Sequence, residues 1–162
     1  LVQVSGRAGR ADNTDRSGEV LIQTRHSTHQ SLQTLINQGY HALATQLLDE
    51  RRQAGMPPYA ALAILRAEAI NAGAPAQFLS AARSQAEALL AQMPNGHQVQ
   101  ISAPLPAPME KRATRYRQQL LLRSPQRADL QNLLSVLCLQ LEQMNTQRNV
   151  RWSVDVDPQD MI

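Results

Sequence analysis

Residues 115–123 read RYRQQLLLR, and this alternation of polar and apolar residues is typical of a strand with one face on a core. The inward positions are Tyr116, Leu120 and Leu122. Ser124 and Pro125 follow, a residue type that caps helices and one that suits the first helical turn. The sequence therefore predicts a strand that passes directly into a helix.

Three other segments have the pattern of strands. Residues 62–69 are largely apolar, while residues 99–103 and 150–156 alternate. Two segments have apolar residues at helical spacing, residues 76–93 and the stretch after Pro125. The stripe of the second helix comprises Leu130, Leu133, Leu134, Leu137, Leu141 and Met144.

The order strand, helix, strand, strand, helix, strand predicts an α/β (α+β) domain of the ferredoxin-like βαββαβ type. Both helices should cover one face of a four-stranded antiparallel sheet, because each has one apolar stripe. The prolines at 104, 106 and 108 predict a loop between the second and third strands. The other face of the sheet should be polar and mostly basic, with Gln98, Gln100, Arg117, Gln119, Arg123, Arg151 and Asp155.

A boundary falls at the sequence MPPY, residues 56–59, and divides the chain into residues 1–58 and 59–162. In the first part, residues 19–24 are predicted to form a short strand. Two helices should follow, one from about residue 27 that stops at Gly39 and one over residues 40–54.

The composition excludes several classes of protein. The chain has 162 residues, a formal net charge of +3 and a sequence pI of about 9.6, and all but one of its 16 basic residues are Arg. No apolar run approaches the ~18 residues of a membrane helix. The single cysteine, Cys138, excludes an internal disulfide and suits a packing role in a reducing cytosol. We therefore expect a cytoplasmic protein.

Residues 3–10 match the pattern Q-x-x-G-R-x-G-R. This pattern resembles the last conserved motif of superfamily 2 helicases, and residues 1–58 then resemble the tail of a RecA-like helicase lobe. The resemblance implies that Gln3, Gly6, Arg7, Gly9 and Arg10 contact ATP and its Mg²⁺. Arg7 and Arg10 would reach the γ-phosphate, with Arg10 as the arginine finger, because phosphoryl transfer needs positive charge there.

Other parts of an ATPase are absent from the sequence. No G-x-x-x-x-G-K-[ST] loop is present, since the one lysine, Lys111, follows Glu110. This chain alone should therefore not hydrolyse ATP. His26 and His29 are three residues apart but lack cysteine partners, so a zinc site there is not expected.

Residues 110–127 concentrate positive charge. The six basic residues of this segment are accompanied by one acid, Glu110, which is typical of contacts to nucleic-acid phosphates. The alternative is a solvated surface. Tyr116 and Trp152 fall on the core side of their strands, which disfavours base stacking on the open face. The basic residues are Lys111, Arg112, Arg115, Arg117, Arg123 and Arg127.

Taken together, the motif of residues 3–10 and the segments at 18–20, 50–59, 115–123 and 154–158 resemble the C-terminal part of the PriA family of replication-restart helicases. The resemblance implies an ATP-dependent 3′–5′ DNA helicase that recognises stalled forks and starts primosome assembly in bacteria. We then expect the chain to be part of a longer protein, with a zinc module upstream.

The resemblance also implies two kinds of partner for the C-terminal domain. Branched DNA would contact Lys111, Arg112, Arg115, Arg117 and Arg123. The acidic tail of single-stranded DNA-binding protein would contact Arg127 and Gln131, and other primosome proteins would assemble with the enzyme.

Two other functions remain open from the residues themselves. The basic face could bind an acidic peptide and no DNA, which would make this a protein-interaction domain. The chain could also come from another superfamily 2 ATPase, although such a protein would lack the resemblance after Arg10.

Overall fold

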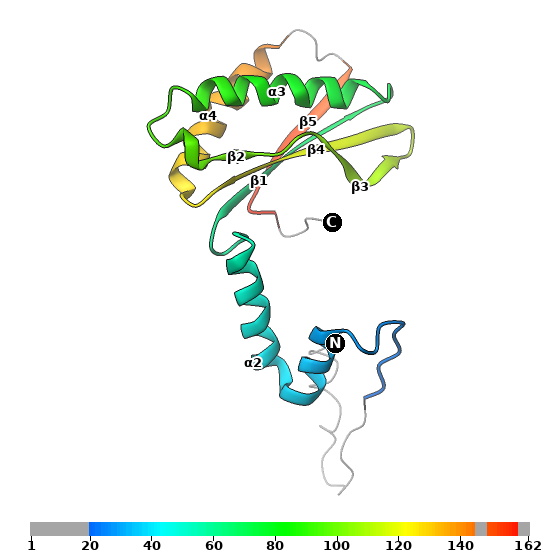
Figure 1. Cartoon of the computed structure of the whole chain (residues 1–162). Coiled ribbons are helices and arrows are strands. Elements are labelled where there is room, and N and C mark those ends of the chain that lie inside the picture. The colour runs from blue at the N-terminus through cyan, green and yellow to red at the C-terminus, as the bar shows by residue number, and fades with distance from the viewer. Residues whose placement is uncertain (1–19, 145–148, 159–162) are drawn as a thin grey trace, which may run out of the picture. The chain divides into compact units, whose positions relative to one another are not determined.

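The computed structural model describes residues 20–144 and 149–158 (Figure 1). The chain divides into two compact units, Leu1–Glu50 and Arg51–Ile162. The proposed nucleotide motif, residues 3–10, lies outside the described residues.

Helix α2, Gln30–Gln53, begins in the first unit and is broken at Gly39, whose backbone has φ 83 and ψ −178. A positive φ is accessible to glycine at little cost, so Gly39 ends one helical segment and a second starts at once. Thr34 Oγ1 donates a hydrogen bond of 2.9 Å to Gln46 Oε1 across the break. The prediction of two helices separated at Gly39 is confirmed.

The strand predicted over residues 19–24 is wrong for the part that the structure describes. Residues 20–24 are irregular, and Leu21 is 90% exposed. A strand needs a neighbour for its backbone groups, and residues 20–50 contain no second strand. No sheet of a RecA-like lobe is therefore visible in this described range.

The second unit has an antiparallel sheet with two helices on one side (Figure 1). Its strands lie in the order β2-β4-β1-β5, which is the order of a ferredoxin-like fold, and β3 also pairs with β4. The α+β, ferredoxin-like prediction is confirmed. The elements are β1 Ala61–Ala69, α3 Ala74–Leu90, the 3-10 turn η1 Gly96–Gln98, β2 Gln100–Ile101, β3 Leu105–Arg112, β4 Arg115–Ser124, α4 Arg127–Gln143 and β5 Val150–Val156.

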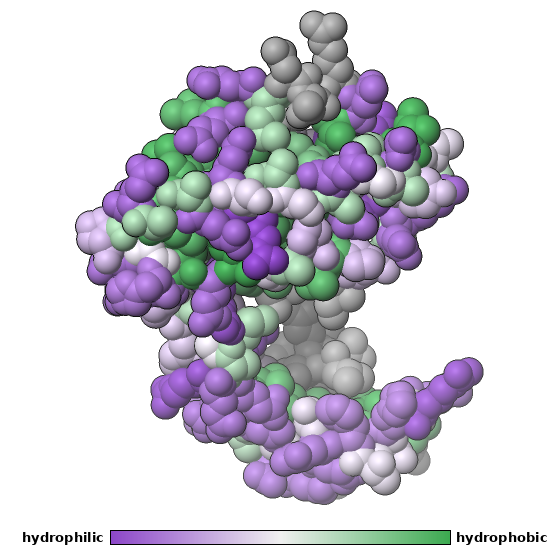
Figure 2. All heavy atoms as spheres, turned by 45° about the horizontal axis from the view of Figure 1, so that its top comes forward, coloured by the Kyte–Doolittle hydropathy of each residue, from purple (hydrophilic) through white to green (hydrophobic). Residues whose placement is uncertain are grey.

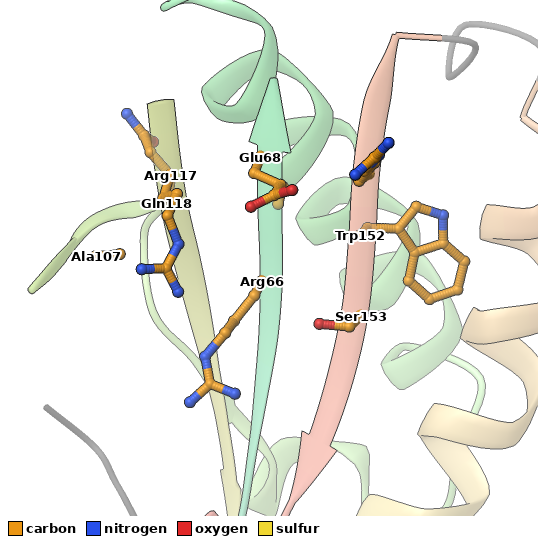
Figure 3. A pocket seen from close by; sticks show the side chains of 9 residues that line it. Arg66, Glu68, Ala107, Arg117, Gln118, Trp152 and Ser153 are labelled. Carbon is orange, nitrogen blue, oxygen red and sulfur yellow. The ribbon is translucent and has the colours of Figure 1, made fainter. Parts of the chain in front are cut away.

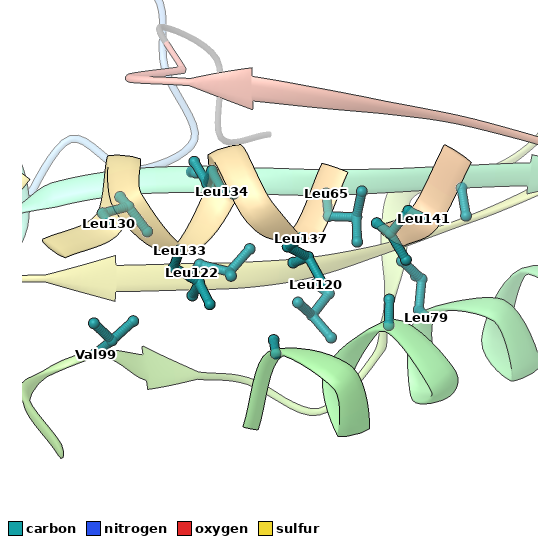
Figure 4. Packing of buried hydrophobic residues seen from close by; sticks show 14 of the residues in the cluster. Leu65, Leu79, Val99, Leu120, Leu122, Leu130, Leu133, Leu134, Leu137 and Leu141 are labelled. Carbon is teal, nitrogen blue, oxygen red and sulfur yellow. The ribbon is translucent and has the colours of Figure 1, made fainter. Parts of the chain in front are cut away.

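The central pairing is that of β1 with β4, in which Leu65 lies opposite Leu120 and Ala63 opposite Leu122. These residues face the helices, and leucines of α3 and α4 pack onto them (Figure 4). Strand β5 pairs with the other edge of β1, and its Trp152 stacks against Phe78 of α3 with ring centroids 6.3 Å apart. The core therefore lies between the sheet and the two helices.

The loop predicted from the prolines is wrong, because residues 105–112 form strand β3. Pro106 lies opposite Gln118 of β4, and the register shifts between Pro106 and Lys111. Proline cannot donate to a ladder but is accepted on an edge strand and at irregularities. Prolines thus mark the edge of this sheet rather than a break in it.

The start of α4 differs from the prediction by two residues. Ser124 is the last residue of β4, and its Oγ accepts a hydrogen bond from the Gln126 backbone N–H at 3.1 Å. The helix itself begins at Arg127. Ser124 therefore stabilises the turn before the helix instead of capping the helix.

Hydrophilic and apolar side chains are interspersed over the side of the domain seen in Figure 2. On α4, Val136 and Leu139 are exposed by 44% and 60%, while Leu137 between them in sequence is 1% exposed. None of the helices in the described part of the chain is long and apolar enough to cross a membrane.

Replacing Leu137 by Ala should lower the free energy of unfolding by about 2–5 kcal/mol, because it removes buried methyl groups and leaves a cavity. Leu139→Ala on the same helix is the matched control and should change it by less than about 0.5 kcal/mol. Urea unfolding of both variants checks this. Equal losses would show that α4 does not bury the predicted face.

Candidate nucleic-acid interface

The hairpin of β3 and β4 carries the first basic side chains of the predicted interface. Arg112 lies opposite Arg115, and Lys111 lies opposite Tyr116. The two-residue turn between them has Ala113 at φ 54, the kind of backbone that hairpin turns favour. Lys111 and Arg112 are exposed at the end of the hairpin.

Tyr116 is held by the hairpin rather than by the core. The Lys111 Nζ lies 4.7 Å from the centroid of the Tyr116 ring, a cation–π contact. Tyr116 faces the helix side of the sheet, opposite Ala69, as its position in the alternation predicts. It nevertheless lines a surface hollow of about 710 Å³ together with Arg115, Asn149 and Arg151. The prediction that Tyr116 points to the helix side is therefore confirmed, and its place near the end of the strand leaves it only half-buried.

The sheet face opposite the helices is organised in rows across β4, β1 and β5. One row is Arg117, Glu68 and Arg151, and the next is Gln119, Arg66 and Ser153. The register thus places the predicted strand residues on this open face, while Gln98 lies in the turn η1 before β2. The residues whose predicted position on the open face is confirmed are Gln100, Arg117, Gln119, Arg123, Arg151 and Asp155.

Two ion pairs involve the charged side chains of these rows. Arg66 Nη1 lies 2.6 Å from Asp155 Oδ2, and Arg115 Nε lies 3.8 Å from Glu68 Oε1. The four side chains are 25–41% exposed, so water screens each pair and its contribution to stability is at most about 1 kcal/mol. The pairs orient the guanidinium groups more than they stabilise the fold.

A pocket of about 230 Å³ opens on this face (Figure 3). Trp152 turns its ring away from it, toward the helices. The pocket is therefore lined mainly by polar and charged side chains. They include Arg66, Glu68, Arg117, Gln118, Arg151 and Ser153, with Ala107 contributed by β3.

The other end of the open face is apolar, which the prediction of a polar, basic face did not include. Leu62 and Ile64 alternate with the core residues of β1 and so point away from the helices. They are nevertheless 1% and 0% exposed. The signal was the unbroken apolar run at 62–65, which is typical of a strand buried on both faces.

Arg123, a predicted DNA contact, makes contacts within the domain. Its guanidinium donates hydrogen bonds to the backbone carbonyls of Ala54 and Gly55, at 2.6 Å and 3.4 Å, and to the side chain of Gln100. Gly55, at φ 58, lies two residues after the end of α2, where the Met56 N–H binds the Arg51 carbonyl. Arg123 therefore satisfies carbonyls at a helix C-terminus.

Arg127 and Gln131, the predicted peptide contacts, lie at the start of α4. Arg127 is the first residue of the helix and forms an ion pair with Asp157. The Asp157 backbone N–H is bound in turn to the Leu62 carbonyl at 2.9 Å. Gln131 is exposed one turn further along the helix, on the same side as Arg127.

Cys138 is half-buried on α4. Burial raises the pKa of its thiol, and the nearby Glu142 carboxylate adds to the rise. A raised pKa disfavours the reactive thiolate, which agrees with the predicted packing role.

Sequence reasoning missed Arg66, Glu68 and Ser153 of the open face. The first two are embedded in an apolar segment, residues 61–69, and look like interruptions of it. Their spacing of two residues could have indicated that both lie on the open face, because alternate positions of a strand share one face.

The sequence matches the family described as primosomal protein N C-terminal domain over residues 52–159. It is 38% identical to the replication restart protein PriA of Haemophilus influenzae over 99% of this chain and 20% of that protein. It is 34% identical to the PriA protein of Synechocystis over 98% of this chain and 17% of that protein, and 30% identical to that of Bacillus subtilis over 100% and 19%. The chain belongs to the PriA family of replication restart proteins.

The chain spans about a fifth of the length of these curated relatives. Among solved structures, a de novo designed protein resembles 62% of the chain at 8% identity, with a TM-score of 0.43, which is too low to bear on the fold.

Replacing Arg123 by Met should lower the free energy of unfolding by about 1–3 kcal/mol, since it leaves carbonyls at the end of α2 without their donor. Arg117→Met, which removes the same charge from the same strand, is the control and should cost less. Urea unfolding separates the two variants. A loss at Arg117 equal to that at Arg123 would contradict the structural role of Arg123.

Proposed function

We propose that this chain binds branched DNA for an ATP-dependent 3′–5′ helicase that acts at stalled replication forks and starts primosome assembly. The observation that carries the proposal is the basic hairpin of a PriA-family domain. Lys111 and Arg112 are exposed at its end, with the Lys111 ammonium over the Tyr116 ring, and Arg115 follows on β4. Exposed guanidinium and ammonium groups are the usual partners of DNA phosphates.

The chemistry of the surface favours recognition of DNA shape over sequence. Phosphate contacts position a protein on DNA but carry no sequence information. Trp152 faces the helices, and Tyr116 is engaged by Lys111, so no aromatic platform is presented on the described open face. Such a surface suits a fork, whose distinctive feature is its geometry.

The proposal includes a nucleotide role for residues 3–10. Arg7 and Arg10 would contact the γ-phosphate of ATP and Mg²⁺ bound elsewhere in the full-length protein, with Gln3, Gly6 and Gly9 shaping the site. The support is the match of these residues to a helicase motif. The zinc of the family would bind upstream of this chain.

Arg127 and Gln131 are proposed to bind the acidic tail of single-stranded DNA-binding protein. Arg127 combines its charge with the N-terminal end of α4, and both features attract a carboxylate. Asp157 already occupies a position beside Arg127, so a carboxylate of the tail would compete with it. Other primosome proteins are expected partners of the full-length enzyme.

The same contacts support a second candidate, a domain that binds an acidic peptide and no DNA. Arg127 paired with a carboxylate is the observation that favours it. The two candidates differ in their binding to a fork, which the following experiment measures.

The 162-residue chain should bind labelled fork DNA more tightly than matched duplex, with an affinity that falls steeply as salt rises. Lys111→Gln and Arg112→Gln should each weaken binding and reduce the salt slope by about one, because each removes a phosphate contact. Arg83→Gln on α3 removes the same charge from the helix side and should change neither. Fluorescence anisotropy across a salt series measures all four proteins.

Absence of DNA binding at low salt, with binding of an acidic peptide retained, would overturn the DNA proposal and favour the second candidate. Equal effects of Arg83→Gln and the two hairpin variants would mean that net charge, rather than the hairpin, governs binding.

In the full-length protein, Arg10→Ala should abolish most ATP turnover and leave fork affinity within about twofold, because an arginine finger acts on the transition state. Steady-state ATPase rates and fork anisotropy measure the two effects. A parallel loss of fork affinity would show that Arg10 supports the fold instead.

A further inference from the structure

The pocket on the open sheet face is lined by three arginines that come from three different strands. Arg117 belongs to β4, Arg66 to β1 and Arg151 to β5. Their side chains lie on one face because the register of the sheet puts all three at outward positions. The rigid sheet therefore fixes their separation, unlike that of arginines on a loop.

The side chains that line the pocket have a net positive charge. Asp155 pairs with Arg66, and Glu68 pairs with Arg115 outside the lining at a long 3.8 Å. In the part of the chain that the structure describes, neither Arg117 nor Arg151 forms an ion pair. These two guanidinium groups are thus available to an anion.

Arg117 and Arg151 stand on either side of Glu68 in one row of the sheet. Neighbouring strands are about 4.8 Å apart, so their backbones are separated by roughly 10 Å. Two long side chains at that spacing can converge on one anion between them. The Ser153 side chain, beside Arg66 in the next row, adds a hydroxyl donor to the same pocket.

We infer that Arg66, Arg117 and Arg151 form a phosphate-binding pocket on the open face of the sheet, and that its ligand is a backbone phosphate of DNA. This inference rests on the proposed function of DNA binding and extends the contact surface from the hairpin onto the sheet. Planar guanidinium groups bind phosphate oxygens in pairs, which gives strong and directional contacts.

The surroundings favour a DNA phosphate over the carboxylates of a peptide. Peptide ligands usually anchor apolar side chains in a pocket or groove, and the Trp152 ring, which could have formed one, is stacked on Phe78. The larger hollow beside the hairpin also includes Arg151, together with Arg115 and Tyr116. Arg151 thus links the pocket to a second basic surface that leads to the hairpin, as an extended phosphate backbone needs.

Removing the charge of Glu68 should change DNA binding in the opposite direction from removing that of an arginine. Its carboxylate lines the pocket and repels a bound phosphate, so Glu68→Gln should strengthen DNA binding about threefold. Arg117→Gln and Arg151→Gln should each weaken it about three- to tenfold and reduce the salt slope by about 0.7 on single-stranded DNA. Arg83→Gln, on α3, is the control of equal charge and should have no effect.

The measurement is anisotropy of a fluorescein-labelled oligothymidylate with the 162-residue chain and its variants, across a salt series. Circular dichroism melting checks that each variant is folded. The expected pattern is weaker binding for the two arginine variants, tighter binding for Glu68→Gln and no change for Arg83→Gln.

Unchanged binding by Arg117→Gln and Arg151→Gln, with Lys111→Gln still weakened, would overturn the pocket and leave the proposed DNA function intact. Absence of DNA binding by the unmodified chain would overturn both. Loss of acidic-peptide binding by the arginine variants, with DNA binding unchanged, would assign the pocket to a peptide and contradict the inference.

Discussion

The antiparallel pairing of β1 with β4 is the constraint on which the rest of the domain depends. It sets Leu65 opposite Leu120 under the helices, and by the same alternation it sets Glu68 opposite Arg117 on the other face. A shift of register by one residue would exchange the two faces of a strand. It would bury Arg66 and Glu68 under α3 and α4, and burying an unpaired charge is far more costly than losing one leucine contact.

The same pairing explains how one sheet can have a packed core on one side and, around Arg66 and Glu68, a charged surface on the other. Leucines of α4 cover the helix side of β1 and β4, which makes the strands rigid (Figure 4). The arginines of the open face then project from fixed backbone positions and need little further ordering when an anion binds. Arg123 connects this face to the end of α2, because it binds the carbonyls of residues 54 and 55.

Sequence patterns predicted the parts of the fold in which one local signal agrees with the tertiary structure. The alternation in residues 115–123 and the leucine stripe of α4 each indicate a face, and the structure buries that face. The predictions fail where the local structure depends on a pairing partner that is distant in the sequence. Residues 20–24 have the composition of a strand but no partner in the described chain, whereas β3 has prolines but pairs with β4.

The candidate site was predictable in its charge but only partly in its geometry. The basic segment at 110–127 was evident, and the register confirms the outward position of Arg117. Arg123 could not be assigned a structural role, because its acceptors lie almost 70 residues earlier in the chain. The pocket arises from three strands, so no single segment of sequence contains it.

We propose that the open face of the sheet, rather than the helix layer, contacts DNA. An NMR titration of the ¹⁵N-arginine-labelled chain with a short single-stranded oligonucleotide tests it most directly, by following each side-chain Nε–Hε signal. The signals of Arg66, Arg117 and Arg151 should move together and saturate with the ligand, while that of Arg83 on α3 should stay in place. Movement of Arg83 with the open-face signals unchanged would contradict it.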